Sequence, residues 1–168
     1  ELIDVVSVLR DQHPDLQLFI IGDGPQKGDL HEKIAEAGLS DAIHLLGRLP
    51  KEKLGEYILA SDVFVLNTSY EGLSHQLLEV MALGVPVVTT AVGGNVELIE
   101  DEVSGYTVEA NDVGALIEKI SFLLENPAVS QAMQTAAQAR TELFTREAVI
   151  ARLVTLLNSK TYYENSCD

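Results

Sequence analysis

Residues 71–79 read Glu-Gly-Leu-Ser-His-Gln-Leu-Leu-Glu, and the chain continues Val-Met-Ala-Leu-Gly-Val-Pro-Val-Val-Thr over residues 80–89. An apolar segment, residues 62–66, precedes this stretch and is separated from it by small polar residues. The pattern predicts a buried strand, a polar loop that carries Glu71 and a helix that carries Glu79. The Gly-Val-Pro tripeptide then ends the helix before a second buried strand.

The loop with Glu71 follows the carboxyl end of a strand, where open α/β sheets bind their ligands. The first N–H groups of a helix have no partner inside it, so those around Gly72, Leu73 and Ser74 suit a phosphate. A phosphate would repel two carboxylates beside it. Glu71 and Glu79 therefore fit better as hydrogen-bond acceptors for sugar or ribose hydroxyls.

These residues resemble the donor half of retaining glycosyltransferases of the GT-B fold. The family signature is Glu-x7-Glu followed by Met-Ala-x-Gly-x-Pro-Val-Val, and it is present here from Glu71 to Val88. Weaker matches occur at Gly22-Asp23-Gly24-Pro25, at Gly47-Arg48-Leu49 and at Gly93-Gly94-Asn95-Val96-Glu97. The resemblance extends from residue 1 to about residue 158, and it implies a nucleotide-diphosphate sugar as donor substrate.

The resemblance implies a role for each matching residue. Glu71, taken as the catalytic position, would contact the hydroxyls of the donor sugar, and Glu79 would accept hydrogen bonds from the ribose. The diphosphate would lie at the N–H groups of Gly72, Leu73 and Ser74. The residues expected at the nucleotide base are Gly47, Arg48 and Leu49. No Asp-x-Asp triplet occurs, and the resemblance implies an enzyme without metal or cofactor.

Other candidates have a structural interpretation as well. His75 is expected to be an exposed residue at the start of its helix, with a donor-facing role as the alternative. Gly22-Asp23-Gly24-Pro25 lacks the third glycine of a dinucleotide fingerprint, so a turn is favoured there. Gly93 and Gly94 are expected to permit a tight loop, which the family places facing the cleft.

In the resembling family this domain opens with a strand that ends in Gly-Arg-Leu, followed by a loop with a lysine. The family uses that arginine and lysine to clamp the donor diphosphate. This sequence begins instead at the helix that comes next, and the strand would be central in the usual sheet order. The N-terminal, acceptor-binding domain has no counterpart either. We therefore expect a piece of a longer enzyme.

Composition and charge exclude several other classes of protein. The 168 residues are enough for one domain with a substantial core, and 46% of them are hydrophobic. Cys167 is the only cysteine, so no disulfide framework or thiolate metal site is expected. A net charge of −15 argues against nucleic acid as a partner. No membrane-spanning run or signal peptide is recognisable, so a cytoplasmic protein is expected, with peripheral membrane association of the full-length enzyme left open.

Apolar periodicity predicts one α/β domain over residues 1–158, with a doubly wound, Rossmann-like parallel sheet and helices on both of its faces. Strands are expected at residues 16–21, 43–46, 62–66, 85–89 and 105–108. Helices are expected at residues 1–12, before Gly38, and at 51–60, 74–84, 95–99, 112–125, 127–140 and 145–158. Asn126 is expected to cap the helix that Pro127 begins. Residues 159–168 are expected to form a polar tail.

Two rival functions share this fold. A nucleotide-sugar epimerase can have it, although such enzymes lack this Glu-x7-Glu motif with its Met-Ala-x-Gly-x-Pro continuation. A non-catalytic α/β binding module is the other alternative, in which both carboxylates would be relics.

Overall fold

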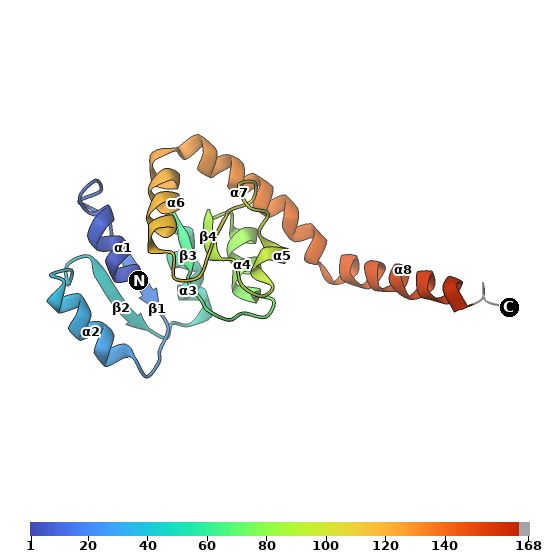
Figure 1. Cartoon of the computed structure of the whole chain (residues 1–168), viewed down its shortest axis with the longest axis horizontal. Helices are drawn as coiled ribbons and strands as arrows, with labels where there is room; N and C mark the ends of the chain where they lie inside the picture. Colours follow the sequence, from blue (N-terminus) through green and yellow to red (C-terminus); the bar gives the residue numbers. More distant parts are fainter. Residues whose placement is uncertain (165–168) are drawn as a thin grey trace.

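Parallel strands alternate with helices along the chain, as the apolar periodicity predicts (Figure 1). The computed structural model describes residues 1–164, and its side chains up to residue 158. The strands are β1 (Leu18–Ile21), β2 (Ile43–Gly47), β3 (Phe64–Leu66), β4 (Val87–Thr90) and β5 (Tyr106–Val108). The helices are α1 (Leu2–Leu9), α2 (Lys27–Glu36), α3 (Lys51–Leu59), α4 (His75–Leu83), α5 (Asn95–Leu98), α6 (Val113–Glu125), α7 (Pro127–Thr141), the 3₁₀ helix η1 (Glu142–Phe144) and α8 (Arg146–Glu164).

The strands form two parallel sheets rather than one continuous sheet. One sheet pairs β1 with β2, and the other has the order β3-β4-β5. In the described part of the chain, one edge of β1 and one edge of β3 therefore lack a strand partner. The interruption lies where the resemblance places an additional central strand.

Helices cover both faces of the three-stranded sheet, which confirms the doubly wound architecture. Val87 and Val88 are fully buried neighbours on β4, and their side chains point to opposite faces. Val88 packs in a cluster with residues of α1 and α6, whereas Val87 packs with residues of α3, α4 and α5.

Helix α1 connects the cores of the two sheets. Its residues Val5 and Leu9 pack in the cluster that contains Val88 of β4. Val6, on the adjacent face of the helix, packs instead with Ile43 and other residues around β1 and β2. Within the described residues, no strand pairing joins the two sheets, and α1 packs on both of them.

The C-terminal region differs from the expectation in two details. Asn126 precedes α7 as predicted, but its side chain does not cap that helix; its Nδ2 donates to the Phe122 carbonyl of α6 at 2.8 Å. The last helix continues to Glu164, so residues 159–164 of the expected tail are helical. Residues 165–168, with Cys167, lie outside the described residues. Figure 1 shows α8 extending away from the rest of the molecule.

Candidate functional site

The loop after β3 is fastened to β4 by buried hydroxyl groups. The Thr90 Oγ1 donates to the Thr68 carbonyl at 2.6 Å and accepts from the Thr68 N–H at 3.2 Å. The Thr89 Oγ1 donates to the Leu66 carbonyl at 3.0 Å. Both threonines are fully buried, so the chain that leads to Glu71 leaves the sheet in a fixed direction.

The same loop is held from its other side by Gly93 and Gly94. The Gly94 N–H donates to the Gly72 carbonyl at 2.9 Å. A Cβ on Gly93 would overlap the Glu71 carbonyl oxygen, and a Cβ on Gly94 would come within 2.5 Å of the Gly72 carbonyl oxygen. The expected tight loop is therefore present, and it packs backbone against backbone on the residues of the motif.

Helix α4 begins directly after this loop. Ser74 is buried and caps the helix, because its Oγ accepts from the Leu77 N–H at 3.3 Å. In the part of the chain that the structure describes, the N–H groups of Gly72 and Leu73 donate to no protein acceptor. These donors lie at the positive end of the α4 dipole, which suits an anionic group.

Glu79 projects from α4 toward the start of α3. Its Oε1 accepts from the Lys51 Nζ at 2.7 Å, with 45% of the Glu79 side chain and 77% of the Lys51 side chain exposed. This hydrogen bond raises the pKa of Lys51 above its ordinary value. The Glu79 side chain, in the middle of α4, is thus held by α3. The Glu71 backbone packs instead against Gly93, just before α5.

The segment expected at the nucleotide base lies at the end of β2. Gly47 is buried, has a φ of +70°, and accepts at its carbonyl from the Gly22 N–H at 2.9 Å. A Cβ at this position would lie 3.5 Å from the Lys27 Nζ. Arg48 is exposed and Leu49 is half-buried. The backbone here needs glycine, because an L side chain rarely adopts this conformation.

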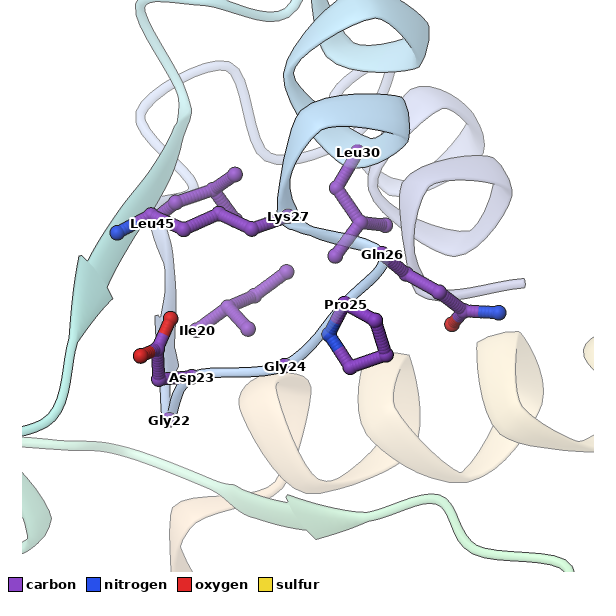
Figure 2. Close-up of a pocket in the computed structure, with 9 residues that line it drawn as sticks. All are labelled: Ile20, Gly22, Asp23, Gly24, Pro25, Gln26, Lys27, Leu30 and Leu45. Atoms are coloured by element: carbon purple, nitrogen blue, oxygen red, sulfur yellow. The ribbon is translucent and has the colours of Figure 1, made fainter.

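A cavity of about 310 Å³ opens beside Gly47, between the ends of β1 and β2 and the start of α2. Figure 2 shows the Lys27 side chain reaching across it from α2 toward β2. The turn expected at residues 22–25 forms one wall, and α2 begins two residues after Pro25. The lining residues are Ile20, Gly22, Asp23, Gly24, Pro25, Gln26, Lys27, Leu30 and Leu45.

The structure adds Lys27 and Lys51 to the residues predicted from the sequence. Lysine in the first turn of a helix is unfavourable beside the positive end of the dipole. Lys27 and Lys51 are nevertheless the first residues of α2 and α3. This unfavourable placement is the sequence feature that could have identified both lysines as candidate site residues. His75 is exposed, as expected.

In the described part of the chain, no group of three His, Cys, Asp or Glu side chains is arranged to hold a metal ion. Among the described helices, none has both the length and the apolarity needed to cross a membrane.

The chain matches the family model described as glycosyl transferases group 1 over residues 1–140. The amylovoran biosynthesis glycosyltransferase AmsK of Erwinia amylovora is 32% identical over 146 residues, which make up 83% of this chain and 36% of that protein. A 2-deoxystreptamine glucosyltransferase of Streptomyces kanamyceticus is 29% identical over 126 residues, 75% of this chain and 33% of that protein. The chain spans about a third of the length of these relatives.

Solved structures show the same fold. Sucrose-phosphate synthase from Thermosynechococcus elongatus has a TM-score of 0.77 at 27% identity, covering 96% of this chain and 42% of that protein. Anabaena HepE, solved in complex with UDP, has a TM-score of 0.79 at 24% identity, covering 94% of this chain and 44% of that protein. The C-terminal domain of LpcC, a glycosyl transferase group 1 family protein from Francisella tularensis, has a TM-score of 0.76 at 24% identity, covering 87% of this chain and 77% of that domain.

Proposed function

This chain belongs to the glycosyl transferases group 1, and on that premise we propose that it is the donor-binding part of a retaining glycosyltransferase. The reaction moves a sugar from a nucleotide diphosphate to an acceptor hydroxyl. The bond between the anomeric carbon and the diphosphate breaks, a bond to the acceptor oxygen forms, and the hydroxyl proton is released. The nucleotide diphosphate leaves with the bonding electron pair.

One arrangement carries this proposal. The loop with Glu71, the unpartnered N–H groups at the α4 start and the Glu79 carboxylate all belong to one loop-and-helix unit. In the sequence, Glu71 precedes the anion-binding N–H groups at the helix start and Glu79 follows them. A nucleotide sugar has the matching order of groups, with a diphosphate between two sets of hydroxyls.

Each residue then has a defined task. Glu71 accepts hydrogen bonds from the donor sugar, and Glu79 accepts from the ribose. Gly72, Leu73 and Ser74 present backbone N–H groups to the diphosphate, where preorganised donors stabilise the charge that develops on the leaving group. Gly47, Arg48 and Leu49 contact the base. The resemblance to this family supports the further proposal that transfer proceeds without a metal ion.

The rest of the catalytic machinery belongs to the longer protein. We propose that a further strand pairs with the free edges of β1 and β3 and carries the basic residues that clamp the diphosphate. The acceptor is bound by an additional domain. Relatives named as glycosyltransferases support transfer over the epimerase and the non-catalytic alternatives.

Nucleotide titration of the 168-residue chain tests donor binding. UDP-glucose is the first probe, because HepE has been solved with UDP and with UDP-glucose, and GDP- and ADP-sugars follow. We expect chemical-shift changes in the amides of Gly72 and Leu73 and a small rise in melting temperature. Absence of binding by all three classes of donor, in this chain and in the full-length protein, would refute the proposed function.

Transfer kinetics of the full-length enzyme test the two carboxylates. Glu71→Ala should lower kcat strongly, because contacts to the moving sugar strengthen in the transition state. Glu79→Gln should act mainly on donor affinity, because the ribose does not react. Negligible effects of both substitutions would contradict the assignment.

A further inference from the structure

The ion pair between Lys51 and Glu79 joins two segments that the proposed function assigns to different parts of the donor. Lys51 is the first residue of α3, and only Pro50 separates it from the proposed base-binding segment at residues 47–49. Glu79 lies on α4, 28 residues further along the chain. Their 2.7 Å contact therefore ties the base segment to the ribose carboxylate.

The position of Lys51 is not explained by the stability of its own helix. A cation in the first turn opposes the helix dipole, and the hydrogen bond and ion pair that Lys51 makes are not with a residue of α3. Lys53, two residues later, makes an ordinary i,i+3 pair with Glu56 of the same helix at 2.6 Å. The partner of Lys51 is instead a carboxylate on another helix.

The ion pair changes what Glu79 can offer to a ligand. A half-exposed glutamate samples several rotamers, and fixing it on binding costs side-chain entropy. Lys51 holds the carboxylate through Oε1, which leaves Oε2 to accept from a hydroxyl. The carboxylate is thus already oriented when the ribose arrives.

We propose that Lys51 is a positioning residue that orients Glu79 and thereby sets the preference of the site for ribose over 2′-deoxyribose. This inference rests on the proposed function, because it requires a nucleotide donor. Lys51 does not touch the reacting atoms. Its contribution is felt only through the hydrogen bond from the ribose hydroxyls to Glu79.

The test compares two nucleotides that differ by one hydroxyl. UDP, GDP and ADP are titrated into the 168-residue chain by NMR, and the tightest of them is compared with its 2′-deoxy form. A hydrogen bond to a charged group is worth enough for about a tenfold preference of the wild type for the ribonucleotide. In Lys51→Met we expect the preference to fall below about twofold, and in Lys51→Arg we expect most of it to return.

Lys53→Met is the matched control, because it removes the same charge from the same helix at a pair that does not involve Glu79. It should lower both affinities equally and keep the preference. Thermal unfolding of each variant shows whether the fold is retained.

The inference is overturned if Lys51→Met keeps the ribose preference, if it binds the ribonucleotide more tightly than the wild type, or if Lys53→Met loses the preference equally. In these outcomes a nucleotide still binds, so the proposed function stands. If no nucleotide binds to any form, including the full-length protein, the proposed function and this inference fail together.

Discussion

At the scale of single residues, the backbone contact between Gly93 and Glu71 gives a direct prediction. Gly93 has a φ of +50°, and a Cβ there would overlap the Glu71 carbonyl oxygen. Gly93→Ala should push the Glu71 loop away and destabilise the fold by about 1–3 kcal/mol. A displacement of about 1 Å at a reacting group can cost about 10²-fold in rate. In the full-length enzyme, transfer should therefore fall far more than UDP affinity.

Gly55→Ala is the control for this substitution. A Cβ on Gly55 would meet no atom within 4 Å, and alanine is favoured over glycine inside a helix by about 0.5–1 kcal/mol. Gly55→Ala should thus be slightly stabilising and leave transfer unchanged. If Gly93→Ala behaved in the same way, the loop would not depend on that close approach.

Individual site residues differ in how far the sequence can identify them. Glu71 and Glu79 are recognisable because their motif is continuous in sequence. The contacts of Gly93 with Glu71 and of Lys51 with Glu79 join residues more than 20 positions apart. Such contacts depend on how β3 and β4 pair and how α3 packs on α4, which local pattern does not determine.

At the scale of elements, the cap of α4 is predicted to couple helix stability to donor binding. Ser74→Ala removes the acceptor of the Leu77 N–H and should cost about 1 kcal/mol, or roughly 2–4 °C in melting temperature for a domain of this size. Because the first turn of α4 then frays, UDP affinity should fall by up to about fivefold, the equivalent of the same free energy.

Thr145→Ala is the control that separates the loss of helix stability from the loss of UDP affinity. Thr145 accepts from the Ala148 N–H at 3.3 Å at the start of α8, the same cap at the same distance but outside the site. Both substitutions should lower the melting temperature, measured by calorimetry, and only Ser74→Ala should weaken UDP. If the two variants bound UDP with equal affinity, the start of α4 would not be part of the phosphate site.

The elements themselves were largely predictable, because their apolar residues follow clear helical or strand periods. Their ends were less so. The periodicity predicts a first helix that reaches residue 12, whereas α1 ends at Leu9. Pro14 disfavours helical backbone just before it, and the Arg10 side chain donates a hydrogen bond to the Pro14 carbonyl. Asn126 carries a typical capping side chain, yet it bonds back to α6. The Asn126 side chain can bond either to an N–H group of α7 or to a carbonyl of α6, and the order of residues in the sequence does not show which bond forms.

At the scale of the whole molecule, two properties oppose the capture of a donor by this chain alone. The net charge of −15 repels a nucleotide diphosphate at long range. The sheet is divided between β1 and β3, and α1 is the one helix of the described residues that has buried side chains in the cores of both halves. The parallel α/β class was predictable from the alternating elements. The division of the sheet could only be inferred from the resemblance, because strand pairing is a long-range property.

We therefore expect the 168-residue chain to bind UDP-glucose only in the high micromolar to millimolar range, roughly −4 to −6 kcal/mol. An extended protein that includes the natural sequence upstream of Glu1 should bind more tightly, because a strand between β1 and β3 would place basic groups at the diphosphate. The gain should shrink as salt rises from about 0.05 to 0.5 M. The same extension with its basic loop residues replaced by glutamine should raise the melting temperature but recover little affinity, which separates strand pairing from charge. Calorimetry on the three proteins measures both quantities. Tight binding by the short chain, unchanged by the extension, would mean that the phosphate site lies elsewhere.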